Sequence, residues 1–167
     1  MKRGGGFAVA VLIPTLPLTV SADDAALENR FNDPFMQVRS ALAGCPEPIG
    51  PRVTADEAKR EGHARVERGT SCWLAGQCEK PNAYLYDAGI ATSVAARFED
   101  KAQFARSTLW ITVQRRFVWV QGCVADDYAD GALESFLAGV PDAERLIVEV
   151  VRGTALRPPY RVMPAQK

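Results

Sequence analysis

The hydrophobic pattern is clearest between residues 109 and 151, where its period changes twice. Large apolar side chains alternate with other side chains over residues 109–113, and a second apolar run covers residues 117–124. Both runs have the period and composition of β-strands. The polar residues between them include Arg115 and Arg116, so the segment predicts a hairpin.

The period then lengthens to that of a helix. Five apolar residues at spacings i, i+3, i+4, i+7 and i+8 share one helix face: Ala129, Ala132, Leu133, Phe136 and Leu137. Asp126 is the expected helix cap, and Gly139 and Pro141 end the helix. Residues 146–151 then predict a last strand.

Two further helices are predicted upstream. Thr54 and Glu57 have the spacing of a capping box, which predicts a helix over residues 55–68 with a solvated, charged surface. A second helix buries Ile90, Val94 and Phe98, spaced by four residues, with Asp87 as its cap.

The remaining mature segments show weaker patterns. Residues 34–43 are compatible with a short helix, and residues 69–81 predict a loop. After residue 152 the chain is basic and proline-rich, which predicts an extended or disordered tail.

Strand alternation gives the hairpin a second apolar face. If Leu109 and every second residue after it in the first strand face the helices, as do Val118 and every second residue after it in the second strand, the remaining side chains face the opposite side of the sheet. These include Trp110, Phe117, Trp119 and Cys123. Large exposed aromatic patches are uncommon, so we favour a face covered by the N-terminal half over an open ligand surface. The ligand-surface interpretation makes Trp110 and Trp119 candidate binding residues.

Residues 1–22 have the features of a secretory signal peptide. Lys2 and Arg3 precede an apolar run from residue 7 to 20, and small residues at 20–22 predict cleavage before Asp23. A transmembrane anchor is the alternative, but two prolines interrupt a run that is shorter than the roughly 20 residues needed to span a bilayer. We therefore expect an exported protein.

The mature chain is close to neutral. Removal of the leader leaves 18 basic and 20 acidic residues, a net charge of −2. A charge this small argues against a dedicated nucleic-acid binder.

All four cysteines lie in the mature chain, and an even number in an exported protein predicts disulfides. Three pairings are open. We favour Cys72 with Cys78, which are close in sequence, and therefore Cys45 with Cys123. A redox-active Cys72–Cys78 pair is the alternative, although the spacing is not the CxxC of thiol oxidoreductases.

The candidate residues for catalysis are few. His63 is the sole histidine and cannot form a multi-histidine metal site, and the carboxylates at 126, 127 and 130 lack the glycine and glutamate of an EF-hand loop. No phosphate-binding or nucleophile motif is present. We expect a protein that is not an enzyme and that uses neither metal nor cofactor.

The element order over residues 87–151, helix, strand, strand, helix, strand, resembles that of a BON domain, a small envelope module of Gram-negative bacteria. The family's second hairpin strand reads apolar, any, apolar, small polar, Gly, any, Val, and residues 118–124 (VWVQGCV) match it. Gly139 and Val140 match the Gly-Val at the end of its second helix. The chain departs from the family at the hairpin turn, where glycine is usual, and in its N-terminal half, which has no counterpart.

The resemblance implies an envelope protein. Family members are periplasmic or attached to the outer membrane, are linked to envelope stress, and are thought to bind phospholipid. We therefore expect an α+β chain with a BON-like αββαβ sandwich over 85–152, preceded by a signal peptide (1–22) and a disulfide-bridged extension (23–84), and followed by the tail (153–167).

The expected function is binding of anionic phospholipid or another envelope component, with Arg115 and Arg116 at the hairpin tip, together with the basic tail, as the best electrostatic contact. The alternatives are a protein–protein interaction module and thiol-disulfide exchange through Cys72 and Cys78. A solvated turn is the competing interpretation of the two arginines.

Overall fold

The computed structural model describes residues 26–67, 70–99 and 102–164. The predicted signal peptide (1–22) lies outside these residues. Within them, no helix is long and apolar enough to cross a membrane.

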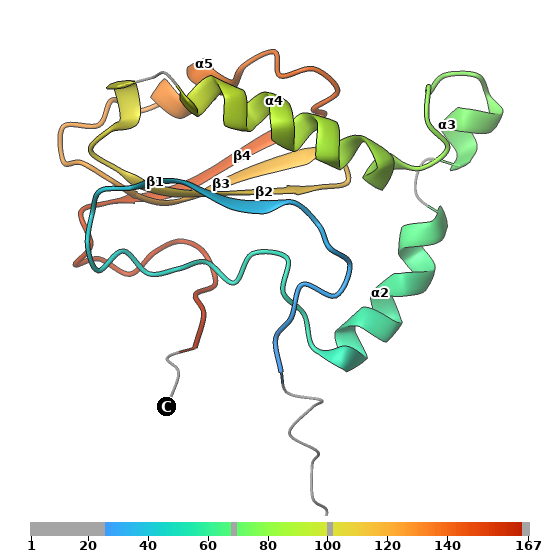
Figure 1. The fold of residues 1–167 in the computed structure, drawn as a ribbon, viewed down its shortest axis with the longest axis horizontal. Helices are drawn as coiled ribbons and strands as arrows, with labels where there is room; N and C mark the ends of the chain where they lie inside the picture. The colour runs from blue at the N-terminus through green and yellow to red at the C-terminus, as the bar shows by residue number, and fades with distance from the viewer. Residues whose placement is uncertain (1–25, 68–69, 100–101, 165–167) are drawn as a thin grey trace, which may run out of the picture.

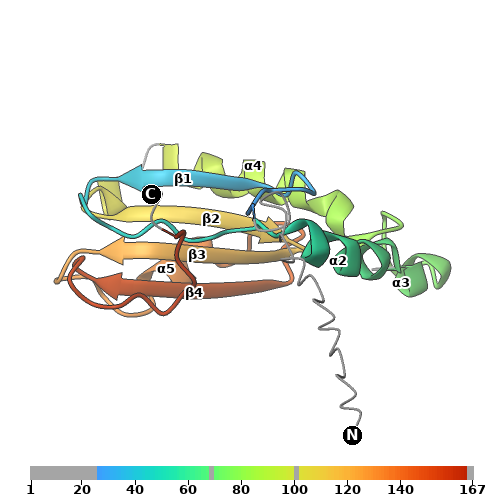
Figure 2. The ribbon, with the colours of Figure 1, turned by 90° about the horizontal axis from the view of Figure 1, so that it is seen from below.

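The structure is α+β and is built on one four-stranded mixed sheet (Figures 1 and 2). The strands are β1 (Phe35–Ser40), β2 (Thr108–Gln114), β3 (Phe117–Val124) and β4 (Arg145–Arg152), in the order β1-β2-β3-β4. The pairs β1·β2 and β2·β3 are antiparallel, whereas β3·β4 is parallel. The predicted hairpin and last strand are therefore both present, and the helix α5 (Ala132–Leu137) connects them.

One face of the sheet is covered by helices. α4 (Asp87–Glu99) and α5 lie on this face (Figure 1), and between them and the sheet is the main core. Its fully buried members include Ile90, Val94, Phe98, Leu109, Ile111, Val113, Val118, Val120 and Leu133. The predicted parity of the two hairpin strands is confirmed by this core.

Gly122 is a core position where the backbone geometry requires glycine. Its φ is +147°, and a Cβ atom placed there would lie 2.0 Å from the carbonyl oxygen of Thr108 on the paired strand. This close approach explains the glycine in the matched strand pattern.

The opposite face is covered by irregular chain from both ends of the sequence. Segments following β1 and β4 run beneath the sheet (Figure 1), and they meet in an isolated antiparallel bridge between Pro48 and Val162. The buried Tyr160 donates its hydroxyl proton to the carbonyl of Pro46 at 2.9 Å. Of the two predicted alternatives for the tail, extended or disordered, the disordered one is wrong as far as residue 164, because Tyr160 is buried and the backbone pairs with residues 47–49.

Residues 34–43 do not form the helix that we predicted. They contain β1, which pairs with β2 and packs Met36 and Val38 against the core. A short apolar run cannot be assigned to helix or strand from its period alone. Here the segment forms a strand because it pairs with the open edge of β2. The sheet therefore includes a strand from the N-terminal extension, and it is not confined to the expected domain that begins at residue 85.

Two further local predictions need correction. The predicted loop over 69–81 contains a short helix, α3 (Thr70–Leu74). Gly131, not Asp126, occupies the N-cap of α5, and the Tyr128 hydroxyl accepts a hydrogen bond from the Leu133 amide at 3.1 Å.

The predicted helix over 55–68 is confirmed as α2 (Ala55–Glu67), including the capping box, in which the Thr54 amide donates to Glu57 at 2.8 Å.

Candidate functional site

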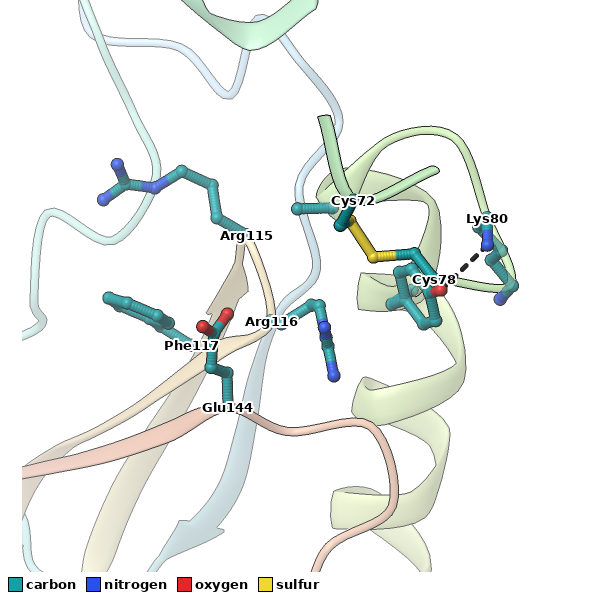
Figure 3. Close-up of a pocket in the computed structure, with 9 residues that line it drawn as sticks. Cys72, Cys78, Lys80, Arg115, Arg116, Phe117 and Glu144 are labelled. Atoms are coloured by element: carbon teal, nitrogen blue, oxygen red, sulfur yellow. Dashed lines mark hydrogen bonds between the residues drawn. A yellow bond between two sulfur atoms is a disulfide. The ribbon is translucent and has the colours of Figure 1, made fainter. Parts of the chain in front are cut away.

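A pocket of about 350 Å³ lies at the end of the sheet where the β2–β3 turn meets the disulfide-closed loop (Figure 3). It combines basic, aromatic and sulfur-bearing side chains. The lining residues are Cys72, Cys78, Lys80, Ala83, Tyr86, Arg115, Arg116, Phe117 and Glu144. α2 and α3 lie beyond the strand ends on this same side of the molecule (Figure 2).

The hairpin turn is held in an uncommon conformation. Arg115 and Arg116 have φ values of 58° and 67°, the left-handed region that glycine usually occupies in two-residue hairpins. The buried carboxylate of Asp87 accepts both of their amide protons, with N–O distances of 2.8 and 2.7 Å. Asp87 was predicted to cap α4, but its carboxylate instead fixes this turn.

Burial raises the pKa of Asp87 above its ordinary value. The two amide hydrogen bonds oppose that rise because they stabilise the carboxylate. The side chain is therefore a structural acceptor placed directly behind the pocket.

One aromatic ring, that of Tyr86, positions two of the cations. The Lys80 Nζ lies 4.7 Å from the ring centroid, and the Arg116 guanidinium carbon lies 4.8 Å from it. The Lys80 backbone amide donates to the Tyr86 hydroxyl at 2.8 Å (Figure 3, dashed line), and the Arg116 Nε donates to the Asp142 carbonyl at 2.8 Å. These contacts orient the charges without neutralising them.

Arg115 extends to the opposite side of the turn (Figure 3). Its guanidinium carbon lies 5.7 Å from the Phe117 ring centroid. Its buried Nε has no hydrogen-bond partner among the described residues. An unpaired buried donor is costly, so this Nε lowers the stability of the turn region.

The pocket is positively charged. Lys80, Arg115 and Arg116 make no ion pair with any residue that the structure describes, and Glu144 is the one carboxylate in the lining. Three cations against one anion favour a negatively charged ligand.

The disulfide between Cys72 and Cys78 forms the wall facing the turn. The loop that it closes carries Trp73 and Leu74, whose side chains are 45% and 80% exposed. Leu85, next to Tyr86, is 55% exposed. Apolar side chains thus project into solvent at the same end as the cations.

A buried ion pair anchors α2 at this end. Arg65 pairs with the Asp33 carboxylate, and its guanidinium carbon lies 3.9 Å from the Phe31 ring centroid and 3.8 Å from that of Tyr84. Gln114, just before the turn, also donates to Asp33 at 2.8 Å. The network connects α2, the N-terminal segment and the hairpin.

The structure separates the other predicted site residues from this pocket. Trp110 is only 8% exposed, and Trp119 is half-buried with residues 50 and 51 nearby. Cys123 is fully buried and is bonded to Cys45, with Cα atoms 5.9 Å apart. The interpretation of a covered aromatic face is therefore supported, although the C-terminal tail contributes to the cover as well as the N-terminal segment.

Sequence reasoning selected Arg115, Arg116, Cys72 and Cys78 but did not place them together. It also missed Lys80, Tyr86 and Glu144, which carry no motif and come together only through the fold. Within the described residues, no group of three or more His, Cys, Asp or Glu side chains could hold a metal ion.

Comparison with family models, with curated proteins and with solved structures gives no match to this chain. The BON resemblance therefore stays a prediction based on the residues quoted above.

Proposed function

We propose that this protein is an exported, non-enzymatic envelope protein that binds anionic phospholipid through the pocket at the hairpin turn. One observation carries the proposal: three cations without ion-pair partners among the described residues line a pocket beside the exposed Trp73 and Leu74. A phospholipid surface offers both phosphate oxygens for the cations and an apolar layer for the side chains.

The two disulfides support an oxidising compartment. The periplasm or the outer-membrane surface agrees with this, and with the BON-like pattern of residues 118–124 and the order of elements from α4 to β4. Binding to a protein partner is the alternative that the experiment below must separate.

The direct test is flotation of the folded, oxidised protein with vesicles. We expect binding to phosphatidylglycerol-containing vesicles at low salt, weak binding to pure phosphatidylcholine, and release as salt is raised. No flotation with the anionic vesicles at low salt would reject the lipid proposal.

Variants locate the contact. Each basic residue near an anionic surface is worth about 1 kcal/mol, so Lys80→Gln combined with Arg116→Gln should weaken binding by about thirtyfold. The matched control is Arg157→Gln, an exposed arginine in the tail.

For the apolar contact, Leu74→Asn should weaken binding, whereas Leu156→Asn, a similarly exposed leucine in the tail, should not. Equal losses in test and control variants would reject this site.

A further inference from the structure

The two disulfides differ in how deeply they are buried. Cys45–Cys123 joins positions 78 residues apart, and Cys123 is completely buried beneath the sheet. The Cys45 sulfur lies 3.9 Å from both the Thr108 carbonyl oxygen and the Tyr160 hydroxyl. Cys45 itself is half-buried, so the completely buried Cys123 sulfur is the shielded end of this bridge.

The Cys72–Cys78 bridge spans six positions and lines the pocket. Both cysteines are half-buried, and the surrounding loop contributes no large buried apolar side chain. Lys80 is two residues from Cys78, and Figure 3 places the Arg116 guanidinium on the Cys78 side of the pocket. Cations beside a disulfide stabilise the thiolate that forms when the bridge opens.

From this contrast, we infer that the Cys72–Cys78 disulfide is a thiol-reactive site whose reaction partner is a small thiol bearing a negative charge, such as a mercaptocarboxylate. The inference goes beyond lipid binding and does not depend on it. It rests on the accessibility of the bridge and on the unpaired charges of Lys80 and Arg116.

The chemistry is ordinary thiol-disulfide exchange. The thiolate of the small molecule attacks the Cys72 sulfur, a mixed disulfide forms, and the Cys78 sulfur leaves as a thiolate in the pocket that Lys80 and Arg116 also line. A second small-molecule thiolate then attacks the sulfur that the first small molecule contributed to the mixed disulfide. This step releases Cys72 as a thiolate. Two small thiols are oxidised to one disulfide, the protein bridge is reduced, and the two cysteine thiolates exchange protons with solvent.

Charge should select the reactant. The attacking thiolate is already anionic, and a carboxylate on the same molecule adds a second attraction to the pocket cations. Glu144, the carboxylate in the pocket lining, repels an anionic thiol and so weakens this selection. A cationic thiol of similar size gains nothing from the pocket and is repelled by it.

The test compares the rates at which 3-mercaptopropionate, 2-mercaptoethanol and cysteamine reduce the folded full chain at low salt. Rates are normalised to thiolate concentration, and each bridge is followed by alkylation and peptide mass mapping. We expect Cys72–Cys78 to open while Cys45–Cys123 stays intact, and the anionic thiol to react about tenfold faster than the cationic one. Quenched samples should carry the mixed disulfide on Cys72.

Variants assign the selectivity to the pocket. Lys80→Gln with Arg116→Gln should abolish the preference, Glu144→Gln should increase it, and Arg157→Gln should leave it unchanged. Because Glu144→Gln is an exposed, conservative change, its result does not depend on the folding of the double variant. Simultaneous opening of both bridges, or an unchanged preference in the double variant, would overturn the inference. The assay contains no lipid, so failed flotation and failed thiol selectivity are separate results.

Discussion

The buried carboxylate of Asp87, at the first residue of α4, accepts hydrogen bonds from the backbone amides of both Arg115 and Arg116 in the β2–β3 turn. Asp87 is 2% exposed, and the two arginines are non-glycine residues in the left-handed region. A helix start thus fixes a turn 28 residues later in the chain, and with it the two arginines of the pocket.

Removal of this acceptor should destabilise the protein. Asp87→Asn keeps the shape but places an amide NH₂ against one of the two backbone N–H groups, so we expect the free energy of unfolding to fall by about 1–3 kcal/mol. Urea denaturation measures the change. Asp126→Asn, an exposed aspartate, is the control and should have little effect. Equal stability of Asp87→Asn and the wild type would contradict the role of this carboxylate.

The turn itself provides a second prediction. Replacing Arg115 and Arg116 by Asn-Gly, the preferred pair for a two-residue hairpin with positive φ, should raise stability by about 1 kcal/mol because the left-handed conformation costs these residues less. The same variant should bind anionic vesicles more weakly than the wild type. A gain in stability together with a loss of binding would show that the arginines serve function at the expense of the turn. A loss of stability would refute the argument from backbone strain.

The raised pKa of Asp87 predicts a pH dependence. The pKa of the folded carboxyl is above the ordinary 3.8 of the unfolded chain. At a pH between the unfolded pKa and the folded pKa, the folded chain therefore holds more protons than the unfolded chain. The contribution of Asp87 to stability therefore increases as the pH falls through that window and decreases as the pH rises. The stability difference between wild type and Asp87→Asn, measured by urea denaturation from pH 4 to 7, should change in this direction. A difference that is independent of pH would contradict the prediction.

Arg65 is predicted to be the most sensitive residue of α2. Arg65→Gln leaves the Asp33 carboxylate buried without its charged partner and empties the space between Phe31 and Tyr84, so we expect a loss of about 3–5 kcal/mol. Arg60→Gln, an exposed arginine on the same helix, should be nearly neutral. Thermal or urea unfolding checks both, and similar small effects in the two variants would argue against the buried pair.

Gly122→Ala should be among the most damaging single substitutions. The added methyl group would overlap the Thr108 carbonyl oxygen, and the φ of +147° is strained for any other residue. We expect a loss of at least about 3 kcal/mol, or failure to fold. Gly89→Ala, in α4 with open space around it, is the control. Normal expression and stability of Gly122→Ala would mean that β2 and β3 are not paired in this register.

Much of the fold could be read from periodicity. The alternation in residues 109–113 and 117–124 placed the hairpin, its inward face and the covered aromatic face, because a strand must turn successive side chains to opposite sides. Cysteine count and spacing favoured the two pairings that the structure contains. β1 was missed, since six residues with mixed burial carry too little period to exclude a helix.

The pocket was predictable only in part. Arg115 and Arg116 were visible as charges at a turn, and Cys72 with Cys78 as a short bridge, but no spacing rule connects residues 72–80 with residues 115–117 and Glu144. By itself, then, the sequence determined the hairpin strands and β4, the core-facing helices and the cysteine pairs that we favoured. The tertiary structure alone decided that Tyr86 holds Lys80 and Arg116 together and that Asp87 fixes the turn. Tyr86 and Asp87 lie about 30 positions from Arg116 in the chain, and only the packing of α4 against the hairpin brings them into contact with it.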